Sequence, residues 1–332
     1  MNILIVGFGK MGAIRYEILN KNKNVNKIII FDENKISKFK KNPKTQIVQN
    51  LKKIDLSNLD AVFVCTYVNA SAGYVKKFLS LKIPVFCEKP PSKNVRILKS
   101  IIKIENKFKT LLVYGFNHRY HNNIIFLKKL LKKNFGKILW IRAEYGKAGS
   151  LDFHKNWRNF KKISGGGILL DQGIHILDLF NYITNTEFSL THSISSKSFW
   201  KIEVEDNAFL TLVNKDNVIA SMHSSANYWN HKFNIEICTE NGFIELDGLI
   251  TPSMTYAPEI VNYALKNKRT GQIKKFNKKI FNKDNSFKIE TIQFLKQVQN
   301  SNINQLNYSN EALSVMKIIE RVYNQDAIKR NK

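Results

Sequence analysis

A short apolar run, Ile3–Val6, passes directly into the segment Gly7-Phe8-Gly9-Lys10-Met11-Gly12, and a helical pattern, Lys10–Asn20, continues from it. Between a strand and a helix, the first glycine of G-x-G-x-x-G allows a tight turn and the second lets a pyrophosphate approach the backbone. The third lets helix and strand pack closely, and the N–H groups at the helix start face the phosphates. The segment therefore predicts a dinucleotide-binding turn, with a purely structural turn as the alternative.

An acidic residue follows at the position that selects between the two nicotinamide dinucleotides. The next apolar strand pattern, Lys27–Phe31, ends at Asp32, twenty residues after Gly12. A carboxylate there accepts hydrogen bonds from ribose hydroxyls and repels a 2′-phosphate. No arginine follows it closely. NAD is therefore favoured over NADP as the cofactor.

The N-terminal third of the chain alternates apolar strand patterns with helical ones. The strand patterns lack internal polar residues, which favours a parallel sheet covered on both faces. Alternating strand–helix order makes such a sheet doubly wound. The expected strands are Ile3–Val6, Lys27–Phe31, Ala61–Cys65, Val85–Cys87 and Leu111–Tyr114, and the expected helices are Lys10–Asn20, Ala70–Leu81 and Val95–Phe108.

The pattern changes after about residue 118. A helix at about 120–133 precedes several strand patterns with short links, one of them turning at Asn241-Gly242, which predicts a mostly antiparallel sheet. We therefore expect an α/β chain of two domains, 1–118 and 119–332. The last helix, at about 309–328, is a candidate to pack back on the first domain.

One segment of the second domain is unusually poor in basic residues. Lys and Arg make up 53 of 332 residues, so a window of 34 would hold about five, yet residues 163–196 contain none. An exposed helix in this chain would carry lysines. The helical pattern Gly167–Thr184 is therefore predicted to be largely buried.

Three ionisable residues interrupt this apolar helix. At 100° per residue, Asp171, His175 and Asp178 share a narrow arc on one face. A carboxylate beside an imidazole fixes its tautomer and raises its basicity, which suits a general base. Gly173 costs about 1 kcal/mol relative to Ala inside a helix, which indicates close approach by a bound ring or another backbone. A satisfied Asp–His pair in the core is the alternative.

The strand pattern Val85–Cys87 ends in Glu88-Lys89-Pro90, at the carboxyl edge where doubly wound sheets bind ligands. A lysine there can stabilise negative charge that develops on a substrate oxygen. An ordinary surface lysine is the alternative reading of Lys89. The proline makes the Lys89–Pro90 peptide bond a candidate for the cis form.

These elements together resemble the Gfo/Idh/MocA family of oxidoreductases. The resemblance rests on the glycine segment at 7–12, Glu88-Lys89-Pro90, Gly115-Phe116-Asn117-His118-Arg119-Tyr120, and Gly165-Gly166-Gly167 through Asp171 and His175.

The resemblance implies a Rossmann domain and a C-terminal α/β domain built on a large, open, mostly antiparallel sheet, which supports dimers or tetramers. It also implies an NAD(P)-dependent enzyme that moves hydride between the nicotinamide and a secondary alcohol or ketone of a sugar. Lys89, Asp171 and His175 would form the catalytic group. Thr66, Glu88, Lys89 and Asn117 would contact the cofactor, as would the glycine segment and Asp32. Helix capping is an alternative role for Asn117.

A loop just before the apolar helix contains Trp157 and Arg158, the latter one of only 8 arginines. An aromatic ring beside cations could stack on a sugar and hold a phosphate or carboxylate. A basic surface loop with a packed Trp is the alternative. The loop resembles that of relatives acting on bacterial surface-polysaccharide sugars, so a nucleotide sugar is the leading substrate.

The net charge of +27 comes from 45 Lys against 8 Arg, spread in short pairs along the chain. Because arginine is the residue that reads base edges, this composition argues against specific nucleic-acid binding. No apolar run approaches the ~18–20 residues of a membrane helix. Three widely spaced cysteines without a C-x-x-C pair favour a reducing cytoplasm, and no metal site is expected.

Two functions remain open from the sequence. One is a dehydrogenase acting on a sugar or nucleotide sugar. The other is a catalytically silent regulatory protein that binds NAD or a sugar nucleotide on the same fold. The presence of Lys89, Asp171 and His175 together favours the enzyme.

Overall fold

The computed structural model of the chain describes residues 1–34, 36, 42–273, 275–300 and 308–330. The chain forms two compact units, Met1–Phe116 with Phe287–Leu313 and Asn117–Ser286 with Ser314–Lys332. The sequence suggested one division at 118/119, whereas each unit is made of two separate segments of the chain. The difference arises because Phe294 and Leu295, late in the chain, pack into the core of the first unit.

The described part of the first unit contains one sheet in the order β3-β2-β1-β4-β5-β6, and all its neighbouring strands are parallel. Its strands are β1 (Asn2–Val6), β2 (Lys27–Phe31), β3 (Thr45–Val48), β4 (Ala61–Val64), β5 (Val85–Cys87) and β6 (Leu112–Tyr114). This order confirms the predicted doubly wound Rossmann sheet. The sequence did not predict β3, a short edge strand whose central residues Gln46 and Ile47 are exposed.

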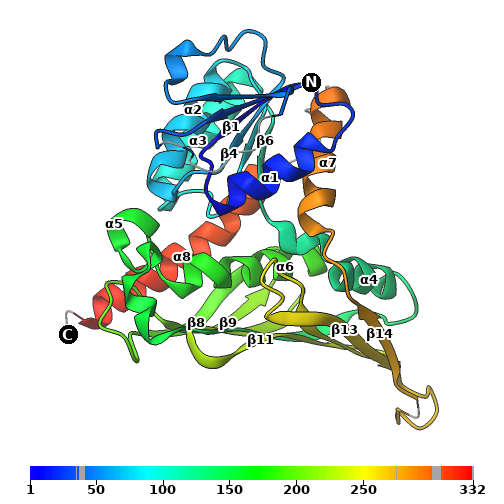
Figure 1. The fold of residues 1–332 in the computed structure, drawn as a ribbon. Coiled ribbons are helices and arrows are strands. Elements are labelled where there is room, and N and C mark those ends of the chain that lie inside the picture. The colour runs from blue at the N-terminus through cyan, green and yellow to red at the C-terminus, as the bar shows by residue number, and fades with distance from the viewer. Residues whose placement is uncertain (35, 37–41, 274, 301–307, 331–332) are drawn as a thin grey trace. The chain divides into compact units, whose positions relative to one another are not determined.

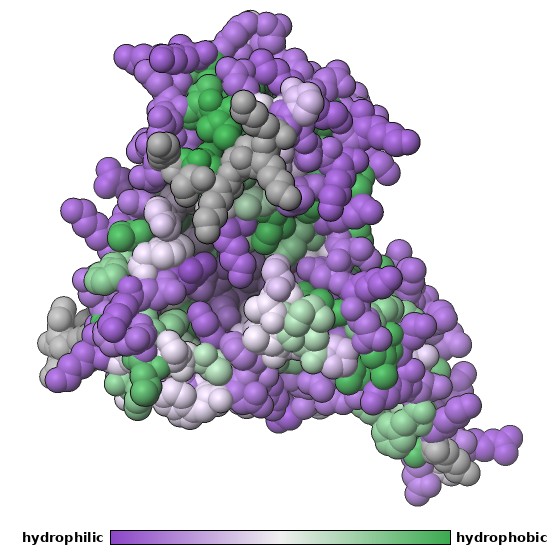
Figure 2. Space-filling view, in the orientation of Figure 1, coloured by the Kyte–Doolittle hydropathy of each residue, from purple (hydrophilic) through white to green (hydrophobic). Residues whose placement is uncertain are grey.

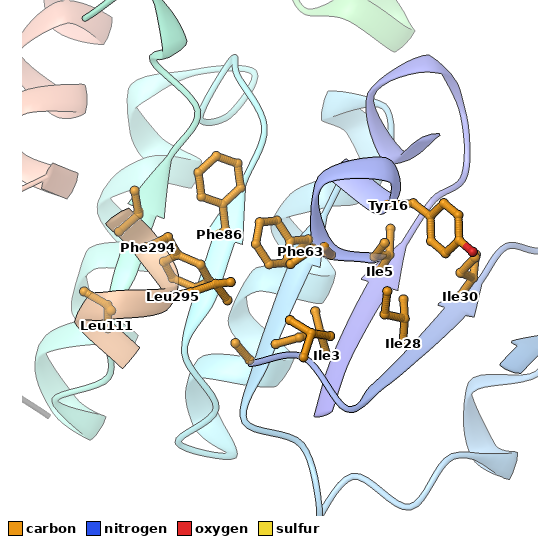
Figure 3. Packing of buried hydrophobic residues seen from close by; sticks show 14 residues of the cluster. Ile3, Ile5, Tyr16, Ile28, Ile30, Phe63, Phe86, Leu111, Phe294 and Leu295 are labelled. Atoms are coloured by element: carbon orange, nitrogen blue, oxygen red, sulfur yellow. The ribbon is translucent and has the colours of Figure 1, made fainter. Parts of the chain in front are cut away.

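Helices cover both faces of this sheet, as the unbroken apolar strands require (Figure 1). They are α1 (Lys10–Asn20), α2 (Val68–Ser80), α3 (Val95–Phe108) and α7 (Ser286–Asn300). In the core, Phe63 of β4, Phe86 of β5 and Phe294 of α7 pack with ring centroids 5.1 to 5.6 Å apart (Figure 3). α7 is therefore part of this core.

The described part of the second unit is built on a sheet in the order β14-β13-β12-β11-β7-β10-β9-β8. β10 pairs with β7 in parallel and the remaining pairs are antiparallel, which confirms the predicted mostly antiparallel sheet. The strands are β7 (Ile138–Ala148), β8 (Phe188–Ser196), β9 (Asn207–Asn214), β10 (Ile219–Ser225), β11 (Asn227–Thr239), β12 (Gly242–Leu249), β13 (Tyr256–Leu265) and β14 (Asn277–Phe281).

Burial alternates along these strands. In β9, Ala208, Leu210 and Leu212 are buried, whereas Phe209 and Thr211 are exposed. Helices α4 (Asn122–Leu131) and α6 (Ile174–Thr184) lie over one face of the sheet (Figure 1). The alternation is that of an antiparallel sheet with one face packed on the core and one face exposed. The chain also contains the short helix α5 (Lys161–Ser164) and the helix α8 (Tyr308–Arg330).

Candidate functional site

The glycine segment forms the turn between β1 and α1 in the first unit. Gly7 has a φ of +90°, which residues with a side chain rarely adopt. A Cβ atom at Gly12 would lie 2.2 Å from the Gly7 carbonyl oxygen, so only glycine lets the helix start this close to the turn. At Gly9, no described atom outside its immediate chain neighbours and its own helix backbone lies within 4 Å of the Cβ position. The turn thus combines a tight bend, a closely packed helix and an accessible middle position, as a pyrophosphate requires.

The carboxylate of Asp32 lies beside this turn. It accepts hydrogen bonds from the backbone N–H of Phe8 at 2.7 Å and of Asn34 at 2.9 Å. Each carboxylate oxygen has two acceptor sites, and Oδ2 accepts only the Phe8 N–H among the described residues, so it can take a further donor such as a ribose hydroxyl. Lys10 and Met11 form the first turn of α1, where Lys10 is exposed and Met11 half-buried. These positions fit the adenosine side of a dinucleotide.

The parallel strands β1, β4 and β5 end in register, so the residues that follow them gather at one edge of the sheet. Gly7, Thr66 and Lys89 lie there. The Oγ1 atom of Thr66 is buried and has no hydrogen-bond partner among the described residues. Lys89 is half-buried, and its bond to Pro90 is cis. A buried hydroxyl without a partner beside the glycine turn is a group that a bound ligand can satisfy.

A buried arginine that the sequence did not single out binds the carboxylate of Glu88. Arg15 of α1 donates to Glu88 Oε1 at 2.9 Å and to Glu290 Oε2 at 2.5 Å, and it also donates to Thr291 at 3.0 Å. Its side chain is fully buried. Burial opposes the charge, but Glu88 and Glu290 outweigh that effect and raise the pKa of Arg15.

The position of Arg15 on the buried face of α1 is a sequence signal that could have predicted this charge cluster. The buried residues of α1 are Gly12, Arg15, Tyr16 and Leu19, spaced as the core-facing stripe of a helix. An arginine on such a stripe needs a carboxylate partner in the core. The cluster fixes Glu88 immediately before Lys89. Contact of Glu88 with a cofactor stays a prediction.

In the second unit, glycines at the start of the apolar helical segment make room for a buried carboxylate. A Cβ at Gly167 would lie 2.0 Å from the Glu205 carbonyl oxygen, and one at Gly166 would lie 2.1 Å from the Tyr323 hydroxyl. The Glu205 carboxylate accepts from the N–H groups of Gly167 and Leu169, each at 3.1 Å, and from Tyr323 at 2.9 Å. Burial raises the pKa of Glu205, and these hydrogen bonds oppose that effect. Glu205 thus caps this segment.

The segment Gly167–Thr184 is not the single regular helix that the sequence predicted. A π-helical turn, Leu169–Gly173, precedes α6. The 100° spacing therefore does not apply to Asp171, which lies inside the turn. A Cβ at Gly173 would lie 2.8 Å from Leu169 Cδ1 and 3.1 Å from Met222 Cε of β10, so neighbouring side chains account for this glycine. π-turns of this kind occur frequently at functional sites.

The prediction that this helix is buried is confirmed, and its ionisable residues have specific neighbours. His175 is 3% exposed, and its ring stacks on that of His118 at 3.7 Å with 15° between the planes. Asp178 is 1% exposed and forms a two-point ion pair with Arg119, whose Nε lies 2.8 Å from Oδ2. The polar face of α6 is therefore held by the segment Asn117–Tyr120.

A chain of buried polar groups leads away from His118. Its Nδ1 lies 3.2 Å from Asn117 Oδ1, and the Asn117 amide nitrogen lies 3.4 Å from His121 Nε2. His121 Nδ1 lies 2.6 Å from Glu259 Oε1. The Asn117 amide also donates to Ser286 at 3.2 Å. Asn117 thus orients the histidine that stacks on His175, and its contact with a cofactor stays a prediction.

Trp157 and Arg158 are brought to the π-turn. The Nε atom of Arg158 lies 3.1 Å from Asp171 Oδ2, and its guanidinium lies 4.4 Å from the centre of the Trp157 ring. Arg158 is therefore engaged with a predicted catalytic carboxylate. The sequence had proposed it as a partner for a substrate anion.

The described residues contain no group of three or more His, Cys, Asp or Glu side chains placed to hold a metal ion. In the same part of the chain, no helix is both long and apolar enough to cross a bilayer. Hydrophilic residues cover most of the face seen in Figure 2, in keeping with lysines distributed along the whole chain.

Two family models match the chain. A model described as an oxidoreductase family with an NAD-binding Rossmann fold matches residues 1–116, and a model of the GFO/IDH/MocA C-terminal domain matches residues 126–245. Myo-inositol 2-dehydrogenase of Thermotoga maritima is 30% identical over 196 residues, which are 56% of this chain and 56% of that protein. Glucose-6-phosphate 3-dehydrogenase of Bacillus subtilis is 30% identical over 128 residues, which are 37% and 36% of the two chains. The chain thus spans about half, or less, of the length of these curated relatives.

The fold also matches solved structures over nearly its full length. KijD10, a 3-ketoreductase from Actinomadura kijaniata in complex with NADP and TDP-benzene, matches with a TM-score of 0.80 at 14% sequence identity. The match covers 98% of this chain and 97% of that one. This likeness shows that the two proteins share a fold.

Proposed function

Because this chain belongs to the Gfo/Idh/MocA family of oxidoreductases, whose first domain is an NAD-binding Rossmann fold, we propose that it is an NAD(P)-dependent dehydrogenase. The reaction is reversible hydride transfer between the nicotinamide and the carbon of a secondary alcohol or ketone. The substrate is a sugar or nucleotide sugar. The observation that carries the proposal is the buried His175, stacked on His118 in a chain with a fully formed glycine turn.

His175 takes the hydroxyl proton of the substrate as the carbon loses hydride, and it returns a proton in the reverse direction. Asp171 orients His175, and Arg158 pairs with the Asp171 carboxylate. Lys89 stabilises the negative charge that develops on the reacting oxygen. The chemistry that the bound nicotinamide supplies is the acceptance or donation of hydride.

The glycine turn and Asp32 would hold the dinucleotide, Gly9 on the side of the pyrophosphate and the Asp32 carboxylate as an acceptor for the adenosine ribose. The Asp32 carboxylate would repel a 2′-phosphate, so NAD is the preferred cofactor. Thr66, with its buried and unpartnered hydroxyl, fits a ligand at the same edge. The names of two relatives that are 30% identical, an inositol dehydrogenase and a sugar-phosphate dehydrogenase, support a polyhydroxylated substrate.

The test is to incubate the purified protein with NAD or NADP and a panel of substrates while recording absorbance at 340 nm. The panel contains inositol, glucose 6-phosphate and UDP-, GDP- and dTDP-linked sugars. We expect reduction of NAD with at least one of them, and slower reduction of NADP. Firm NAD binding without turnover on any substrate would favour the silent regulator. Absence of binding to both NAD and NADP would exclude the dehydrogenase.

The exposed face of the second sheet supports a homodimer or homotetramer. Large apolar side chains of neighbouring strands lie on it: Ile194, Phe209, Ile219 and Trp140, all at least 43% exposed. Clustered exposed apolar residues mark interaction surfaces. We propose that copies of this chain pair through this face in the cytoplasm, and that the enzyme serves surface-polysaccharide sugar synthesis.

Replacing Phe209 by aspartate is expected to convert the oligomer to monomer, since each copy would bury an unpaired charge in the interface. Light scattering after size-exclusion chromatography measures the mass. Leu81→Asp, at an exposed site in the first unit, is the matched control and should leave the mass unchanged. An unaltered mass in Phe209→Asp would place the interface elsewhere.

A further inference from the structure

A cavity in the second unit is not used by the reaction described above. It has a volume of about 520 Å³ and opens where β7 ends. Its walls come from β7, the 150–156 loop, the bulged part of β11 and the segment before β13. The volume lies within the range of roughly 300–1,000 Å³ typical of small-molecule sites.

The polar lining of this cavity consists mainly of hydrogen-bond donors. Lys147, Lys155 and His231 line it, as do the hydroxyls of Ser253 and Thr255. A carboxylate, Asp152, is also part of the lining, but its Oδ1 lies 2.8 Å from the Lys155 ammonium. The described lining is therefore net positive. Ammonium and hydroxyl groups around a cavity suit a group that offers several acceptor oxygens and negative charge.

His231 adds a second, independent indication. Its Nδ1 atom is buried and has no hydrogen-bond partner among the described residues. Burial lowers the pKa of His231, and the positive charge of Lys147 lowers it further. A bound anion would oppose both effects, because it would accept a hydrogen bond from the ring and offset the charge of Lys147.

The cavity lies next to the catalytic helix within the same unit. The His231 ring is 4.6 Å from that of Tyr256, and the Tyr256 hydroxyl lies 3.5 Å from Gln172 Nε2. Gln172 directly precedes Gly173 in the π-turn and follows Asp171. Arg158 is already paired with Asp171. An anionic part of a substrate bound near Asp171 would therefore meet Lys147 and His231 rather than Arg158.

We propose that this cavity binds a phosphate or diphosphate group of the substrate, so that the sugar that is oxidised is a phosphorylated one. This inference rests on the proposed function and narrows its substrate class. Two sources share this chemistry, a simple sugar phosphate and a nucleotide sugar, and the experiment separates them.

The experiment is isothermal titration of the full chain, saturated with NAD, with glucose 6-phosphate, UDP, inorganic phosphate and glucose in separate runs. We expect the phosphorylated ligands to bind more tightly than glucose. Preference for glucose 6-phosphate or for UDP identifies the source. Lys147→Gln, which keeps an uncharged stem of similar length, should weaken binding about tenfold or more, because hydrogen bonds to charged groups contribute about that much. Lys155→Gln, at an exposed position, should weaken it as well.

Lys215→Gln removes an exposed lysine at the β9–β10 turn and is the charge-matched control, for which unchanged affinity is expected. Equal affinity of wild type and Lys147→Gln for every phosphorylated ligand would overturn the inference. Tighter binding of glucose than of the phosphorylated ligands would overturn it as well. NAD affinity, titrated in the same samples, is a separate readout. If the protein did not bind NAD, the proposed function would be overturned. If it bound NAD but showed no preference for phosphorylated ligands, only the present inference would fail.

Discussion

Replacing His175 by alanine is expected to lower turnover about a thousandfold while NAD affinity stays within twofold of wild type. Loss of a general base costs roughly 10²–10⁴ in rate. The glycine turn and Asp32, which are proposed to hold NAD, belong to the other compact unit, so the substitution leaves them intact. Steady-state rates at 340 nm and titration with NAD provide the two measurements.

Two further variants separate catalysis from folding. His175→Gln keeps the bulk that packs against His118 and should be as inactive as the alanine variant. His192→Ala, at an exposed histidine of β8, should retain full activity. Near-normal turnover of His175→Ala, with normal thermal unfolding, would remove His175 from the proton-transfer role.

Replacing Arg15 by methionine is expected to destabilise the protein by about 3–5 kcal/mol, because two buried carboxylates lose their counter-charge. Glu88 and Glu290 both lie within 3 Å of the Arg15 guanidinium. Methionine retains the apolar contact with the Phe86 ring, which lies 4.4 Å from the guanidinium, so the lost charge is the main change. Chemical denaturation measures the free energy of unfolding.

Adding Glu290→Gln to the Arg15→Met variant should recover part of the stability. The control Arg96→Met, at an exposed arginine of α3, should change it by less than about 0.5 kcal/mol. A similar loss in both variants would mean that the charge cluster is not the cause.

The sequence was sufficient to predict the type of each sheet, although not the strands β3, β13 and β14, because continuous apolar runs and alternating patterns report burial directly. It also predicted the glycine turn and the burial of the segment Gly167–Thr184. The strand β3 was not predicted because its central residues are exposed at a sheet edge, where no burial pattern forms.

The side-chain clusters were harder to predict. Arg15 donates to Glu290, and the Gly167 N–H donates to Glu205. Both hydrogen bonds join residues that are far apart in the chain. The π-turn depends on packing against β10, which no helical periodicity reveals. His118 was noted in the sequence, but its stacking on His175 follows only from the fold.

The discontinuity of the first unit has a consequence for any attempt to isolate it. A gene fragment ending at residue 118 would encode the whole parallel sheet and the glycine turn but not α7. It would expose Phe63 and Phe86 to water and leave Arg15 with one carboxylate in place of two. Grafting the 287–300 segment onto such a fragment through a linker would restore both. The portable nucleotide-binding module of this protein is thus a split one, assembled from the opening of the chain and a late helix.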